Sequence, residues 1–178
     1  EIEFDRDRIF HSIRNFFRER YKNRMLGEGY GADLIEAVLS ARFDTMGELP
    51  PRIAQLQQFV DEFGEFRAVA LTFKRVTNIL KNQPVSYNVD ETLFEADCES
   101  VLWQGYLDLK DEIHRLTERK EYFQALSTIA GLRKAVDDFF DGVEVLTESP
   151  ALRENRLAVL HNIARLFLGL ADFSRFSI

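Results

Sequence analysis

The stretch "SPALRENRLAVLHNIARLFLGLADF", residues 149–173, repeats apolar residues around almost the whole of a helix. Its start is marked by Ser149, which can accept hydrogen bonds from free amides, and by Pro150, which suits a first helical turn. The apolar side chains that follow are Leu157, Leu160, Ile163, Ala164, Phe167, Leu170 and Ala171. They cover well over half of a helical wheel, so we predict that this helix is central to the fold.

One charged residue, Arg156, lies inside that apolar arc. A buried guanidinium without a partner costs a large free energy, so a carboxylate should lie beside it. Asp141, in the preceding segment "FFDG", has apolar neighbours that indicate partial burial. We therefore predict a structural ion pair between Arg156 and Asp141 that ties the helix to the turn. The alternative is that Arg156 faces a ligand.

The polar side of the same helix is narrow. It carries Asn155, His161, Asn162, Arg165 and Asp172. From the sequence, this arc can face solvent, a partner or RNA.

Nearly every other segment also repeats apolar residues at spacings of three and four, and strand-like alternation is scarce. We therefore predict an all-α fold, with one domain over residues 1–178. The first helices are expected over residues 5–26, 33–43, from "LPPRI" at 49–53 to Gly64, and over 66–81. Asp33 followed by Glu36 is typical of a capping box.

The longest loop signal is "NQPVSYNVD", residues 82–90. We expect Asn88 or Asp90 to cap the next helix, which is built on Leu93, Phe94, Val101 and Leu102. Shorter helical pieces should follow through Leu116, Leu126 and Phe140.

Composition excludes several classes of protein. Apolar residues make up 46% of the chain and charged residues 30%, which excludes disordered and fibrous chains. No apolar run reaches the roughly 18 residues of a membrane span, and no signal-peptide pattern opens the chain, so we expect a cytoplasmic protein without a membrane partner. Cys98 is the single cysteine and is expected to be a small buried hydrophobe. Because the chain opens on Glu1, we expect a fragment of a longer polypeptide.

Charge is spread unevenly along the chain, whose net charge is −7. Seven basic and two acidic residues lie between Arg6 and Arg24, whereas fifteen acidic and six basic residues lie between Asp90 and Glu148. Such a chain can present a basic surface to phosphate despite its net charge. The alternative is two ordinary solvated faces.

Two basic strips follow helical spacing. Arg14, Arg18 and Lys22 are four residues apart and stack along one side of the first helix. The flank of the fourth helix carries Arg67, Lys74, Asn78 and Lys81, with Arg75 further round. Like charges in a row repel, so each strip requires either an anionic partner such as phosphate or acidic neighbours within the fold.

Catalytic motifs are missing from the sequence. His11, His114 and His161 lie on three different predicted helices, none with a partner at zinc-site spacing. No Gly-rich phosphate loop and no Gly-x-Ser-x-Gly elbow occurs. The acidic run at Asp137, Asp138 and Asp141 can bind a cation, or can be solvated helix edge. We expect no catalytic site, metal site or cofactor in this chain, which leaves a binding module.

Several strings together resemble one family. They are "KRVTNIL" at 74–80, "VDDFFDGVEVL" at 136–146, "LRENRLAVL" at 152–160 and "LADFS" at 170–174, with "DLIEAVLSARFD" at 33–44 in support. They are similar to the C-terminal part of the beta subunit of bacterial glycyl-tRNA synthetase. The resemblance implies an anticodon-binding helical bundle of the kind also found in arginyl-tRNA synthetase. It also implies that a partner alpha subunit holds glycine, ATP and Mg²⁺, while the beta subunit binds the glycine tRNA.

This resemblance and the wheel positions together define a candidate tRNA site. Proteins that bind unpaired bases stack them on aromatic or guanidinium planes and hold the phosphates with Lys and Arg. We select Lys74, Arg75, Asn78 and Lys81, with Arg14 and Arg18 as outer phosphate contacts and Tyr87 as a stacking residue. The alternative function is a helical protein–protein interaction module without RNA binding.

Overall fold

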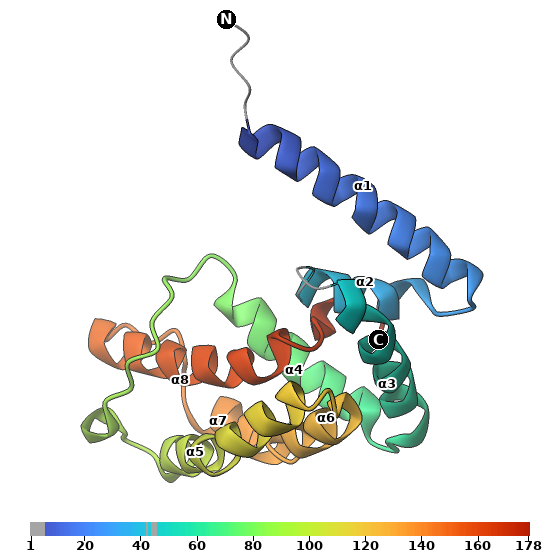
Figure 1. Ribbon diagram of the computed structural model, residues 1–178. Helices are drawn as coiled ribbons and strands as arrows, with labels where there is room; N and C mark the ends of the chain where they lie inside the picture. The colour runs from blue at the N-terminus through green and yellow to red at the C-terminus, as the bar shows by residue number, and fades with distance from the viewer. Residues whose placement is uncertain (1–5, 42, 44–45) are drawn as a thin grey trace, which may run out of the picture.

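The computed structural model describes residues 6–41, 43 and 46–178, and Figure 1 shows their arrangement. Within these ranges all regular secondary structure is helical, which confirms the predicted all-α class. The α-helices are α1 (Arg6–Gly27), α2 (Ala32–Ala41), α3 (Leu49–Glu62), α4 (Phe66–Leu80), α5 (Asp97–Glu118), α6 (Tyr122–Ala130), α7 (Arg133–Gly142) and α8 (Pro150–Leu168). Short 3₁₀ turns are η1 (Met46–Glu48), η2 (Glu91–Leu93) and η3 (Phe173–Arg175).

Helix α8 is the centre of the fold, as its apolar pattern predicts. Every residue from 155 to 164 is buried. It packs against α4 and α5, and η3 folds back onto α4. The ring of Phe73 in α4 lies 4.7 Å from that of Phe167 and 5.6 Å from that of Phe173, measured between centroids. These aromatic contacts join α4, α8 and the C-terminal turn into one core.

Three predicted caps are wrong in whole or in part. Asp90 accepts from the amide of Thr92 and caps only η2, and the following helix begins later, at Asp97. Its first turn is set by Glu99, whose carboxylate accepts from the amides of residues 95 and 96. Ser149 is the N-cap residue of α8 and Pro150 lies in its first turn, as predicted, but the Ser149 side chain makes no capping hydrogen bond. Glu36 forms no capping box with Asp33, because its carboxylate binds Arg18 and Lys22 of α1.

Helix α1 stands off from the rest of the molecule, with its N-terminal end far from the other helices (Figure 1). Its main neighbour is α2. Tyr21 and Met25, both in its C-terminal half, are its buried apolar residues. Burial raises the pKa of Tyr21 to about 12. The attachment of α1 therefore depends on its last turns.

Candidate nucleic-acid interface

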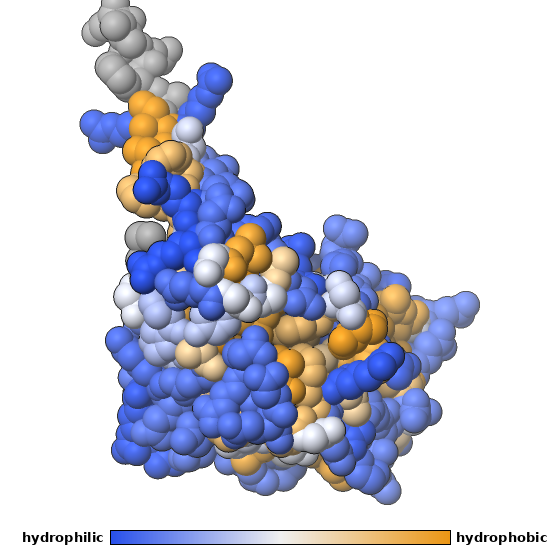
Figure 2. Space-filling view, turned by 90° about the vertical axis from the view of Figure 1, so that its right-hand side faces the viewer, coloured by the Kyte–Doolittle hydropathy of each residue, from blue (hydrophilic) through white to orange (hydrophobic). Residues whose placement is uncertain are grey.

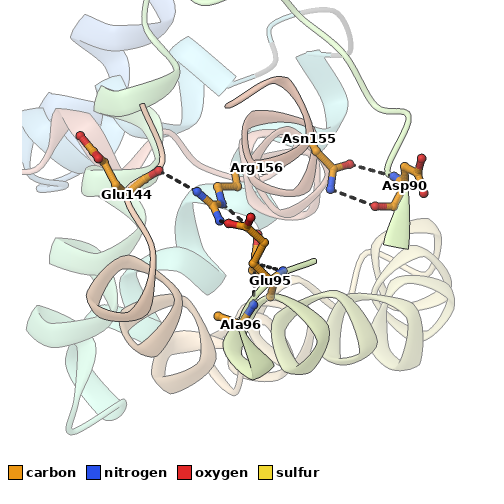
Figure 3. A network of polar contacts seen from close by, with 7 residues as sticks. Asp90, Glu95, Ala96, Glu144, Asn155 and Arg156 are labelled. Carbon is orange, nitrogen blue, oxygen red and sulfur yellow. Dashed lines mark hydrogen bonds and ion pairs between the residues drawn. The ribbon is translucent and has the colours of Figure 1, made fainter. Parts of the chain in front are cut away.

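Polar side chains of α8 hold the connection between α4 and α5 in place. Asn155 binds residue Asp90 in both directions, accepting from its amide at 2.8 Å and donating to its carbonyl at 3.0 Å (Figure 3). Asn162 donates to the carbonyl of Tyr87 at 2.9 Å. His161 Nε2 lies 3.1 Å from the carbonyl of Pro84, and since a carbonyl only accepts, Nε2 carries the proton.

These contacts explain three residues of the polar arc of the last helix. Asn155, His161 and Asn162 are all buried, so Asn155 and Asn162 do not face solvent or RNA, and His161 borders the surface only beside Tyr87. They bond to backbone groups of a segment that has no regular structure between Lys81 and Asp90. The segment is therefore fixed although it is irregular.

Arg156, also in α8, holds the start of α5 in the same way. Its Nε donates to Glu99 at 2.9 Å and its Nη2 to Glu95 at 3.0 Å, while Nη1 donates to the carbonyl of Glu144 at 3.2 Å. Figure 3 shows the guanidinium between Glu95 and Glu144. Burial acts to raise the pKa of Glu99, but the hydrogen bonds from Arg156 and the two amides outweigh it, so this pKa lies below its usual range.

The predicted ion pair of Arg156 with Asp141 is wrong. Arg156 is buried and paired, as expected, but the carboxylates come from the segment before α5 and from its first turn. The side chain of Asp141 is 80% exposed and pairs with Arg75 of α4 at 3.9 Å. Asp141 lies one residue from the end of α7 and its carboxylate turns outward, whereas Glu99 is directed into the core by its own cap.

The fixed connection presents an aromatic ring. Tyr87 is 44% exposed. The guanidinium of Arg165 lies 4.7 Å from the centroid of its ring, and the ring of His161 meets it edge-on at 6.1 Å. Asn162 thus holds the backbone of Tyr87, while Arg165 and His161 contact its ring, so α8 supports both the backbone and the side chain of this residue. An aromatic and a guanidinium plane together are the surfaces on which unpaired bases stack.

A hollow of about 480 Å³ lies beside this ring. Its polar lining comes from Thr77, Lys81, Tyr87, His161 and Arg165, and its apolar lining from Leu80, Val85, Ala164 and Leu168. A second hollow, of about 300 Å³, adjoins Arg165 between α5 and α8 and is also lined by Lys110 and His114. Arg165 thus borders both hollows, and a lysine side chain also lines each of them, Lys81 in the first and Lys110 in the second.

The predicted strip on α4 divides into two parts. Lys81 lines the first hollow, and its Nζ donates to Asn78 at 2.8 Å. Lys74 donates to the carbonyl of Phe176 at 3.1 Å and so holds the C-terminal turn. Arg75 lies over the ring of Phe140 at 4.1 Å and turns towards α7. The structure brings Lys81 and Tyr87 to one hollow, with Asn78 bound to Lys81, but directs Lys74 and Arg75 elsewhere.

The predicted strip on α1 is also divided. Arg14 is exposed. Arg18 donates to Glu36 at 2.7 Å, and Lys22 to the same carboxylate at 2.5 Å. The hydrogen bond from Lys22, and then that from Arg18, hold the pKa of Glu36 below its usual range. Acidic neighbours within the fold thus balance two of the three cations, and none of the three lines either hollow.

Sequence reasoning did not select Arg165 or His161 as site residues. A partial signal exists, because the two lie four residues apart and so share one side of the last helix. Their importance comes from Tyr87, whose loop could not be placed on that side from the sequence.

The part of the chain that the structure describes offers neither a metal centre nor a membrane span. No group of three or more His, Cys, Asp or Glu side chains there is arranged to hold a metal ion. None of the helices described has the length and apolar character to cross a membrane.

The chain resembles known proteins along nearly all of its length. Residues 69–170 match the family model of the DALR anticodon binding domain. The chain is 42% identical over 163 residues to the glycine–tRNA ligase beta subunit of Syntrophotalea carbinolica, an alignment covering 92% of this chain and 23% of that protein. It is 39% identical over 170 residues to the beta subunit of Trichlorobacter lovleyi, covering 96% and 24%. The chain therefore spans about a quarter of the length of these relatives.

Proposed function

The chain belongs to the DALR anticodon binding domain family, and from this premise we propose that it recognises the anticodon of a glycine tRNA as part of a glycine–tRNA ligase beta subunit. The observation that carries the proposal is the Tyr87 ring, which is exposed, fixed by α8 and covered on one side by Arg165. It lies at a hollow large enough for a base and bordered by Lys81.

The proposed recognition follows from the chemistry of these side chains. Unpaired anticodon bases stack on Tyr87 or on the guanidinium of Arg165. Lys81 and Asn78 supply donors and an acceptor at the rim, where base edges and phosphates pass. Arg14 and Arg18 are the outer phosphate contacts in this proposal, and Lys74 and Arg75, which lie against Phe176 and Phe140, add positive charge near the site. A local patch of this kind binds RNA although the chain is acidic, because phosphate contacts depend on the nearby field.

The reaction itself is assigned to the rest of the enzyme. We propose that the alpha subunit holds glycine, ATP and Mg²⁺ and forms the ester, while this chain positions the tRNA. The proposed partners are the glycine tRNA, the remainder of the beta subunit and the alpha subunit, and the proposed location is the cytoplasm. The similarity to named beta subunits supports this assignment.

The test is the affinity of this 178-residue chain for a glycine tRNA, beside the same tRNA with its two anticodon cytosines replaced. Direct reading predicts a loss of about 1 to 3 kcal/mol per changed base. Each measurement is made at two salt concentrations, because phosphate contacts weaken steeply as salt rises. Equal affinity for both tRNAs would overturn anticodon reading by this chain and favour the protein-interaction function.

A further inference from the structure

Helix α1 exposes a stripe of large apolar side chains. The stripe consists of Ile9, Phe10, Ile13, Phe16 and Phe17, which are 43, 68, 50, 58 and 45% exposed. At about 100° per residue, these five positions fall within an arc of about 120°. Figure 2 shows apolar surface on the part of the molecule that projects from the body. Exposed apolar patches of this kind mark interaction sites.

The described helices of the body do not cover the stripe. Helix α1 is attached through Tyr21 and Met25 and through the ion pairs of Arg18 and Lys22 with Glu36. All of these contacts lie in its C-terminal half or point to another side of the helix. The stripe occupies the half that stands away from α2. A helix of this length gains most of its stability from a packed face, so the stripe needs a partner.

Charged residues at the ends of the stripe define the chemistry of that partner. Arg6 and Arg20 fall in the same arc of the wheel, and the guanidinium of Arg20 lies 5.7 Å from the ring centroid of Phe16. The complementary surface is therefore apolar with an acidic rim. RNA complements the stripe poorly, because Ile9 and Ile13 offer no plane on which a base can stack.

A second copy of this chain is also a poor match. Two α1 helices packed face to face would bring Arg6 and Arg20 of one copy close to cations of the other. Among the residues that the structure describes, the other exposed large hydrophobics are Leu26, Leu71, Val85, Tyr87, Val101 and Leu146. They are distributed over α1 itself, α4, α5 and two loops, so they form no stripe to match.

We propose that the α1 stripe docks on an acidic-rimmed apolar surface in the part of the beta subunit that lies outside these 178 residues. This inference rests on the proposed function, since it requires the longer subunit. The lengths support it: the chain covers 23 and 24% of two relatives, so most of each relative lies outside the aligned region. Docking fixes the position of α1 in the subunit, and through α1 it fixes where the surface around Tyr87 lies.

The experiment compares amide hydrogen exchange over residues 8–18 in the full beta subunit and in the 178-residue chain. The stripe variants are Phe10→Glu and Ile13→Glu, and the matched control is Asn15→Glu, which adds the same charge to an exposed position on the other side of α1. We expect protection to rise roughly tenfold or more in the full subunit. Both stripe variants should abolish that rise, and the control should retain it.

Three outcomes would overturn the proposal. They are equal exchange in both proteins, protection of the 178-residue chain that grows with its own concentration, and protection that appears only when tRNA is added. The second outcome indicates a second copy and the third an RNA surface. Discrimination of the anticodon cytosines is measured on the same proteins. Absence of discrimination in the unsubstituted subunit means that the proposed function has failed, whereas equal exchange of α1 in both proteins with discrimination intact means that only the docking proposal has failed.

Discussion

The side-chain amide of Asn162 donates to the backbone carbonyl of Tyr87 at 2.9 Å, across 75 residues of chain. A residue buried in the central helix thereby fixes the one aromatic ring of the α4–α5 connection that faces the hollow. This hydrogen bond is the one that joins the buried side of α8 directly to the backbone of Tyr87. Its removal should affect binding without removing any side chain that contacts RNA.

Replacing Asn162 by Ala should therefore lower tRNA affinity through the mobility of Tyr87. Loss of the hydrogen bond should also lower the free energy of unfolding by about 1 to 3 kcal/mol. Tyr87→Ala should cost about 1 to 3 kcal/mol of binding through lost stacking. Because the first change acts through the second residue, the double variant should bind about as weakly as Tyr87→Ala alone.

The matched control for this comparison of single and double variants is Asn155→Ala. The side chain of Asn155 binds the backbone of Asp90, at the other end of the same connection, with hydrogen bonds of 2.8 and 3.0 Å. It should lose comparable stability and keep its tRNA affinity. Additive binding losses of Asn162→Ala and Tyr87→Ala, measured by titration with labelled tRNA, would contradict the proposed route.

The salt dependence of binding should separate the cations. Lys81→Ala should reduce the slope of log affinity against log salt by about one phosphate contact, whereas Arg165→Ala, which removes a stacking plane, should lower affinity with a smaller change of slope. Lys74→Ala should have a smaller effect, since its Nζ already donates to Phe176. Lys134→Ala is the control, because Lys134 pairs with Asp138 on the exposed side of α7. Equal slopes for Lys81→Ala and Lys134→Ala would show that the hollow is not part of the RNA interface.

The helices could be predicted from sequence because apolar spacing is a local property. Residues 66–80 and 150–168 show this, since each stripe faces the core as the wheel indicates. The apolar arc around Arg156 also predicted its burial and its need for a carboxylate. The identity of that carboxylate was not predictable, because Glu99 lies 57 residues away and is aimed by its own cap.

The site was predictable only in part, for the same reason. Lys81 and Tyr87 were selected from charge and loop position, and the structure places both at one hollow. Arg165 was seen as polar but could not be joined to Tyr87, since an irregular loop carries no periodicity from which to place it. On a helical wheel, Lys74 and Arg18 are free to bind phosphate, but in the structure each donates a hydrogen bond to a group distant in sequence.

Packing at the end of α7 gives a prediction independent of RNA. A Cβ added at Gly142 would lie 2.6 Å from the Sγ of Cys98, a distance that forces one of them to move. Gly142→Ala should therefore destabilise the fold by about 1 to 3 kcal/mol. Adding Cys98→Ala removes the sulfur and should restore most of the loss.

Gly64→Ala is the control for that pair, since a Cβ there meets nothing within 4 Å. Reduced freedom of the unfolded chain should leave it neutral or more stable by up to about 1 kcal/mol. The measurement is urea unfolding followed by circular dichroism. If Cys98→Ala fails to rescue Gly142→Ala, the sulfur is not the obstacle.

The final prediction concerns Arg156 and the pH dependence of stability. Arg156→Met leaves the buried carboxylate of Glu99 without its cation and should cost about 3 to 5 kcal/mol near neutral pH. Asp141→Asn, at the exposed position first predicted to be the partner, should change stability by less than about 0.5 kcal/mol. Urea unfolding at neutral pH compares the two.

The sign of the pH effect follows from the lowered pKa of Glu99. In the unsubstituted chain, the stability contributed by this carboxylate is present above its unfolded pKa, about 4.3, and is lost as the pH falls through the lower folded value. In Arg156→Met, burial without the guanidinium should raise the folded pKa above the unfolded one, so the penalty should shrink as the pH falls. The two stabilities should therefore converge on acidification. Adding Glu99→Gln to Arg156→Met should recover stability at neutral pH, because the amide oxygen still accepts from the amides of residues 95 and 96 but carries no charge. A stability difference that does not depend on pH, with no recovery in the double variant, would instead assign the loss to packing of the arginine stem.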